Sequence, residues 1–151
     1  MKLAKALILR AEAQKKLASL RSSIASHCKV QEGTDPQENP ADLMNEAFGV
    51  IKELRNLVIK INRANTTGKL PDGRSLTEAI GKRDELIQKH SLVLHAIEHS
   101  KIEVDRYGMA EIKWVSCLEV KNLRKQADDL AKNIREINFQ IQEANWNIDL
   151  E

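Results

Sequence analysis

The sequence predicts an all-α protein, an antiparallel bundle of four long helices that forms one domain over residues 1–151. Apolar residues recur at alternating spacings of three and four along four long segments, which places them on one face of each helix. All three prolines fall between these segments and therefore separate the helices. The chain has only five aromatic residues, fewer than most β-sandwiches carry.

The first two helices are expected over residues 3–25 and from residue 40 to near residues 65–68. Asn39 can cap the second helix, and Pro40 suits its first position because proline has no N–H that needs a partner. The stripe of the first helix is Leu3, Ala6, Arg10, Ala13, Leu17, Leu20 and Ile24. The stripe of the second is Leu43, Ala47, Val50, Leu54, Leu57 and Ile61, and we expect Met44, Phe48, Ile51 and Val58 to widen it.

The third helix is expected to follow a capping box at Ser75–Glu78 and to continue to about residue 100. Its predicted stripe is Leu76, Ile80, Ile87, Leu94 and Ile97, with Arg83 and His90 on the same face. Arg10 and Arg83 are basic residues at core positions, so each should pair with a carboxylate, Asp84 and Glu85 being candidates.

The fourth helix carries the most regular pattern and is expected to begin at a second capping box, Ser116–Glu119. Its stripe keeps strict heptad spacing, as in a coiled coil: Val120, Leu123, Ala127, Leu130, Ile134, Ile137, Ile141, Ala144 and Ile148. Between the third and fourth helices, apolar and polar residues alternate on either side of a Tyr-Gly pair, which predicts a short extended or β excursion near residues 101–116.

Charge is balanced overall but uneven along the chain. The 24 basic and 22 acidic side chains leave a net charge of +2, too small to indicate a polyanionic partner, and no nucleic-acid partner is expected. Residues 1–30 have a net charge of +6, whereas residues 31–50 have a net charge of −5. The basic segment can face an acidic partner, or it can be a solvated face that meets the acidic loop of its own or a neighbouring chain.

The chain shows no signal-peptide core and no run of 18 apolar residues, so a cytoplasmic protein is expected, with secretion only by a non-classical route. Cys28 and Cys117 have no metal-ligand spacing and are expected to be buried thiols. Whether they pair is left open by the sequence.

Two polar groups of residues are candidate sites. Amide, guanidinium and carboxylate groups lie close in sequence around the end of the second helix and the turn after it, and Asp105-Arg106-Tyr107 offers a similar set. They can form an anion pocket or a polar interface, or they can cap the helix and brace the loop. The candidates are Asn62, Arg63, Asn65, Asp72, Arg74, Arg106 and Tyr107.

The second group is the H-x-x-E-H motif of His95, Glu98 and His99, in which two imidazoles on one helix face can bind zinc and the carboxylate can act as a base. Such a site needs a third ligand, which the sequence does not place. The alternative is a solvated helix end with two surface histidines. No metal, other cofactor or catalytic residue is therefore predicted.

Several short sequence motifs resemble those of the small bacterial family labelled septicolysin. They occur in the expected order along nearly the whole chain. They are Val30–Gly33, Ile61–Asn65, Asp72–Glu78, Arg83-Asp84, Asp105–Tyr107, Glu111–Val115 and Asn145-Trp146. The resemblance implies a cytolytic, pore-forming protein, although most members of that family have no known biochemical function. It supplies no catalytic residues, and the His95–His99 motif is not part of the resemblance.

The apolar stripes are longer than one slender bundle can bury, so the chain is expected to associate with itself into a symmetric oligomer. The function we expect is that of a non-enzymatic helical scaffold or interaction protein whose partner is a second copy of the chain. A pore-forming cytolysin, which would also bind membranes, is the alternative, and a zinc-dependent hydrolase is a third reading.

Overall fold

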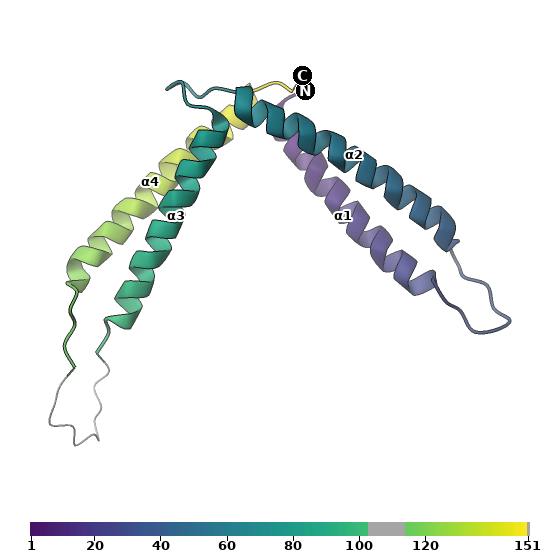
Figure 1. Ribbon diagram of the computed structural model, residues 1–151, viewed down its shortest axis with the longest axis horizontal. Coiled ribbons are helices and arrows are strands. Elements are labelled where there is room, and N and C mark those ends of the chain that lie inside the picture. The colour runs from purple at the N-terminus through teal and green to yellow at the C-terminus, as the bar shows by residue number, and fades with distance from the viewer. Residues whose placement is uncertain (103–113, 151) are drawn as a thin grey trace, which may run out of the picture. The chain divides into compact units, whose positions relative to one another are not determined.

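The computed structural model describes residues 1–102 and 114–150, and within this part of the chain it contains four α-helices and no strands (Figure 1). The helices are α1 (Leu3–His27), α2 (Pro40–Thr67), α3 (Leu76–His99) and α4 (Val120–Asn147). The predicted all-α class is confirmed. Most of the expected extended excursion, residues 103–113, lies outside the described residues.

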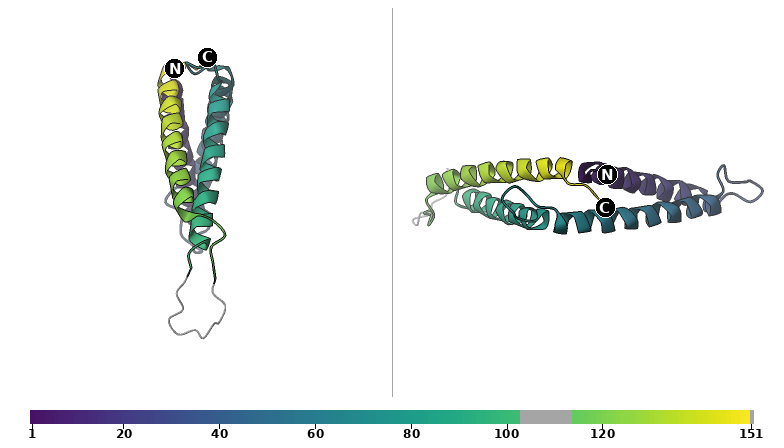
Figure 2. Two further views of the ribbon diagram at one scale, coloured as in Figure 1. Left: turned by 90° about the vertical axis from the view of Figure 1, so that its left-hand side faces the viewer. Right: turned by 90° about the horizontal axis from the view of Figure 1, so that it is seen from above.

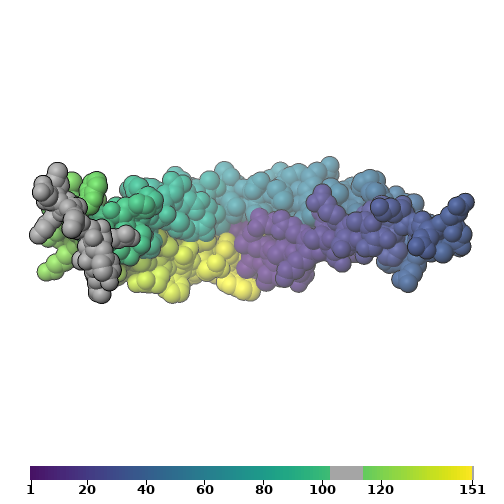
Figure 3. Space-filling model, turned by 90° about the horizontal axis from the view of Figure 1, so that it is seen from below, coloured from purple at the N-terminus to yellow at the C-terminus, as the bar shows by residue number. Residues whose placement is uncertain are grey.

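The helices pack in pairs within two compact units, one of residues 1–76 with 142–151 and the other of residues 77–141. In the first unit α1 and α2 run antiparallel and lie side by side in every view (Figure 2). Their contact is built from the two predicted stripes. Its buried core is Leu20, Leu43, Ala47 and Val50, and Ala13, Leu17, Ile24 and Leu54 pack against it. In space-filling form the surfaces of α1 and α2 meet along this unit (Figure 3).

The boundaries of α2 follow the predicted capping chemistry. The Asn39 side chain accepts a hydrogen bond from the backbone N–H of Ala41 at 3.0 Å, and Pro40 is the first helical residue. At the other end the N–H of Gly68 donates to the carbonyl of Ala64 at 2.8 Å. The helix therefore begins where its free amides find an acceptor, and it ends at Thr67, within the expected stretch 65–68.

The first unit is closed by a terminal junction, which we define as residues 1–3, 68–76 and 148–150. The N–H of Leu3 donates to the carbonyl of Ile148 at 2.9 Å, and the N–H of Leu150 donates to the carbonyl of Met1 at 2.7 Å. The N–H of Leu76 donates to the carbonyl of Gly68 at 3.1 Å. Leu3 and Leu76 are fully buried, so each contributes about 1.5–3 kcal/mol to folding.

In the second unit α3 and α4 lie side by side (Figures 1 and 2), and the predicted stripe of α4 is confirmed, since all of its members are buried or half-buried. The predicted stripe of α3 was partly wrong. Ile87 and Leu94 are exposed, and the buried face instead follows a strict three-four spacing that also includes the half-buried Arg83 and His90. Its buried members are Leu76, Ala79, Leu86 and Val93. The observed face differs from the predicted stripe by one residue at three positions, because neighbouring apolar residues fit either pattern.

The charged residues on the stripes have different surroundings. The guanidinium of Arg83 donates to Asp84 at 2.8 and 3.0 Å, as expected for a half-buried arginine. The Nε of Arg10 is buried and has no hydrogen-bond partner within the described part of the chain, so the expected carboxylate partner is absent there.

Three further expectations are corrected. The helix α4 begins at Val120 rather than at the predicted capping box, because the Ser116 hydroxyl binds Leu118 in a turn ahead of the helix. Cys28 and Cys117 are exposed and unpaired, not buried. The four residues expected to widen the stripe of α2 are exposed as well: Met44, Phe48, Ile51 and Val58.

Replacing Gly68 should destabilise the protein through the terminal junction. A Cβ at this position would lie 2.5 Å from Cδ1 of Ile148 and 2.7 Å from the backbone oxygen of Ala64. For G68A we expect a loss of about 1–3 kcal/mol in the free energy of unfolding, measured by urea denaturation. The control is G49A in the exposed middle of α2, where a Cβ meets nothing within 4 Å. That variant should gain about 0.5–1 kcal/mol, and equal losses in both variants would contradict the role of Gly68.

Candidate functional site

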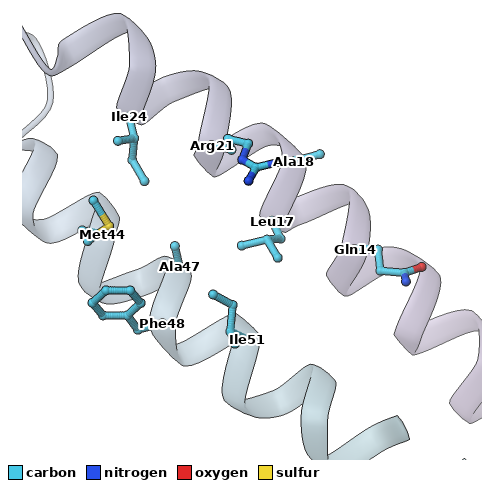
Figure 4. A pocket seen from close by; sticks show the side chains of 9 residues that line it. All are labelled: Gln14, Leu17, Ala18, Arg21, Ile24, Met44, Ala47, Phe48 and Ile51. Atoms are coloured by element: carbon cyan, nitrogen blue, oxygen red, sulfur yellow. The ribbon is translucent and has the colours of Figure 1, made fainter.

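An apolar groove of about 480 Å³ lies between α1 and α2 in the first unit. Figure 4 shows Leu17 and Ile24 directed from α1 toward α2, with Phe48 and Ile51 on the facing helix. The complete lining is Gln14, Leu17, Ala18, Arg21, Ile24, Met44, Ala47, Phe48 and Ile51. We refer to this feature as the α1–α2 groove.

The groove exists because α2 is apolar over a wider arc than α1 can cover. Met44, Phe48 and Ile51 each follow a member of the buried stripe by one residue, which turns them about 100° around the helix axis. Their exposed fractions are 40%, 59% and 48%. A single neighbouring helix buries one stripe, so this second set of apolar side chains is left beside the helix contact.

The charges of the helix pair are found mainly away from the groove. Arg21 is the one charged side chain in its lining. A separate shallow depression has a charged lining that includes Glu12, Lys16 and Glu53. There the Lys16 ammonium lies 2.7 Å from the Glu46 carboxylate, and this hydrogen bond raises the pKa of Lys16. The groove is therefore suited to bind an apolar surface, and its lining offers no nucleophile and no acid–base pair for chemistry.

The predicted polar cluster is brought together only in part. Asp72 accepts three hydrogen bonds from Arg74, one from its N–H at 3.1 Å and two from its guanidinium at 2.8 and 2.5 Å. Gly73 follows with φ at +85°, a conformation that favours glycine, and its N–H donates to the carbonyl of Leu70 at 2.9 Å. These contacts stabilise the turn, as expected if these residues cap the helix and brace the loop.

The remaining members of the cluster lie on α2 or outside the described residues. Asn62 and Arg63 are exposed, and their carbonyls accept hydrogen bonds from the hydroxyls of Thr66 and Thr67 at 3.0 Å. Asn65 is half-buried. A cavity of only about 40 Å³ touches Arg63, too small for an organic ligand. Arg106 and Tyr107 belong to the segment 103–113, which the structure does not describe.

The H-x-x-E-H motif does place its two histidines together at the end of α3. The rings of His95 and His99 have centroids 4.0 Å apart, and Nδ1 of His99 lies 2.9 Å from the carbonyl of His95. Glu98 accepts a hydrogen bond from Lys101 at 2.6 Å, which lowers the pKa of the carboxyl. Among residues 1–102 and 114–150, no group of three potential ligands surrounds this pair. Two imidazoles alone do not make the three-ligand site that hydrolytic zinc requires.

Sequence reasoning assigned the α2 side of the groove to the core rather than to a site. The signal was present in the sequence, because the apolar residues of α2 cover more than one heptad stripe. The sequence did not show that, within the described residues of the first unit, α1 is the helix that packs along α2 and leaves the second stripe uncovered.

The pairing of Asp72 with Arg74 can be tested by titration. Hydrogen bonds from the Arg74 side chain lower the pKa of Asp72 below its ordinary value of 3.8. The contribution of this pair to stability is therefore present above pH 3.8 and is lost as the pH falls through the lowered pKa. In R74Q we expect the pKa of Asp72, followed by NMR of its carboxyl carbon, to rise toward 3.8. The matched loop variant K69Q should leave it low, and an unchanged pKa in R74Q would show that Arg74 is not its partner.

Among the described residues, no helix is both long enough and apolar enough to span a membrane. The fold is similar to that of a functionally unknown conserved protein of Corynebacterium diphtheriae seen in a crystal structure. The TM-score is 0.91 with 35% sequence identity, and the match covers 100% of this chain and 99% of the other. No curated protein matches the sequence significantly. A family model matches residues 10–150, and the chain accordingly belongs to the family of unknown function DUF6847.

Proposed function

We propose that this protein is a non-enzymatic helical interaction protein that associates with a second copy of itself. The observation that carries this proposal is the α1–α2 groove, with Met44, Phe48 and Ile51 exposed along one side of α2. Exposed apolar side chains gathered in one groove are typical of a protein-binding surface, whereas single ones are ordinary on any surface. The groove lining carries no group suited to catalysis, which supports a binding role.

Burial of the exposed apolar side chains of the groove favours association. Complete burial of a side chain such as phenylalanine contributes about 1.5–3 kcal/mol, and a symmetric interface uses each side chain twice. Three exposed apolar residues from each copy can therefore supply several kcal/mol against the entropic cost of association.

Phe48 provides the first test, because it is the most exposed apolar residue of the groove. The wild-type protein should form a defined oligomer at micromolar concentration in sedimentation equilibrium. F48S should raise the dissociation constant at least tenfold, since each tenfold change corresponds to about 1.4 kcal/mol. I8S is the matched control, because Ile8 is exposed to a similar extent, 52%, but does not line the groove. A wild-type protein that is monomeric at these concentrations would overturn the proposal.

The pore-forming activity implied by the septicolysin resemblance is the second candidate function. The same exposed apolar strip favours it, because an amphipathic helix can bury such a face in a lipid interface. Release of dye from liposomes of anionic or neutral lipid by the wild-type protein, lost in F48S but not in I8S, would support the cytolysin. On the self-association proposal neither liposome type releases dye.

A further inference from the structure

We infer that the partner of the α1–α2 groove is the α2 helix of a second copy, packed antiparallel across a two-fold axis near Ile51. This inference rests on the proposed self-association and specifies its surface, orientation and register. All of the residues it uses belong to the first unit.

The first observation is the spacing of the exposed residues on α2. Met44, Phe48, Ile51, Arg55 and Val58 follow one another at intervals of four, three, four and three residues. This is the spacing of a coiled-coil seam, and it runs beside the stripe that α1 already covers. All five side chains are exposed, Val58 at 39%. The helix α2 therefore has two seams but only one partner in the first unit.

The second observation is that this seam is symmetric about its own centre. Met44 and Val58 each lie seven residues from Ile51, on opposite sides. When two such helices run antiparallel with Ile51 at the axis, Met44 of each copy faces Val58 of the other. A two-fold interface requires this kind of self-complementarity, because every contact must occur twice.

The third observation concerns the polar member of the seam. In the same register Phe48 of each copy lies within one residue, about 1.5 Å along the axis, of the position opposite Arg55 of the other. The Arg55 guanidinium donates to the side chain of Asn56 at 3.1 Å, and it forms no ion pair within the part of the chain that the structure describes. An arginine over a phenylalanine ring makes a favourable cation–π contact. The antiparallel register thus gives Arg55 an aromatic partner and covers Phe48, which is 59% exposed.

The fourth observation is the distribution of charge on either side of the axis. Residues 31–50 carry five acidic and no basic side chains, a net charge of −5. Residues 51–76 carry six basic and two acidic side chains, a net charge of +4. An antiparallel pair places the acidic half of each α2 region beside the basic half of the other, while a parallel pair places like charges together. Complementary charge of this kind selects orientation more than it adds affinity.

Disulfide trapping in the full chain tests orientation and register together. The exposed cysteines are first removed as C28S/C117S, and single cysteines are then introduced and oxidised. I51C should give a disulfide-linked dimer as the main product, because the two copies of position 51 meet at the axis. I8C, exposed to a similar extent on α1, is the control and should remain largely unlinked.

Two more variants separate antiparallel from parallel pairing. Positions 44 of the two copies would lie about 21 Å apart in the antiparallel register, at a rise of 1.5 Å per residue. A disulfide needs a Cα separation of about 4.4–6.8 Å. M44C alone and V58C alone should therefore not link, whereas an equimolar mixture of the two should.

The outcomes distinguish this inference from the proposed function. An oligomeric protein in which I51C does not link, or in which M44C links to itself, overturns the antiparallel α2 interface and leaves self-association standing. A monomeric wild-type protein overturns both. Circular dichroism of each reduced variant should show wild-type helicity, and sedimentation of reduced V58C reports the oligomer independently of trapping. R55E should raise the dissociation constant of that oligomer at least tenfold. If a variant at position 44 or 58 loses helicity, the cysteine at the other of these two positions is used in its place.

Discussion

The structure of the first unit depends on the antiparallel backbone pairing of residues 1–3 with residues 148–150. Two antiparallel helices joined by one loop share a single seam, and their open ends can separate unless something holds them. Here the start of α1 is held by hydrogen bonds from Leu3 and to Met1, and the Lys2 ammonium binds Asp149 at 2.8 Å. The surface ion pair adds little by itself, but the backbone bonds and the burial of Leu3 fix the register of α1 against the rest of the unit.

Packing in pairs also explains where the binding surface arises. A helix in a pair has one neighbour, so an apolar arc wider than about 100° cannot be covered completely. On α2 the apolar arc extends beyond the stripe that α1 covers, to Met44, Phe48 and Ile51. The charged contacts, such as Lys16 with Glu46, lie outside the groove lining. The apolar groove and the charged depression at Lys16 are therefore separate surfaces of the unit, and the difference between them depends on the order of residues on α2.

Much of the fold was predictable because helix periodicity and capping are local properties. The four segments, the Asn39 cap with Pro40, and the stripes of α1 and α4 were all expected from spacing alone. The face of α3 was predicted less well, because the apolar residues at 79 and 80, 86 and 87, and 93 and 94 fit two alternating three-four patterns, and the buried one is that of Ala79, Leu86 and Val93. The exposure of Cys28 and of the second α2 seam could not be predicted, because both depend on which elements pack together.

In the candidate sites, too, local geometry was predictable from the sequence and contacts between distant segments were not. Sequence proximity correctly brought Asp72 to Arg74 and His95 to His99, because each pair lies within one turn. It could not determine whether other groups would approach from elsewhere in the chain, which is what separates a ligand site from a braced loop. The groove depends on how many helices pack around α2, and the spacing of residues in the sequence does not give that number.

The terminal junction has a consequence for how the chain is connected. Residues 2 and 149 are neighbours in space, while the 28–39 loop between α1 and α2 is mostly exposed. A short linker could join the two ends, and the chain could be opened within that loop without interrupting a helix. Such a circular permutant would keep the backbone hydrogen bonds of Leu3, Leu76 and Leu150 at the junction. The helices α1 and α2 would then be held together by the junction and by their shared core without the loop between them. Such a permutant would separate the contribution of the packed surfaces from that of the order in which the chain connects them.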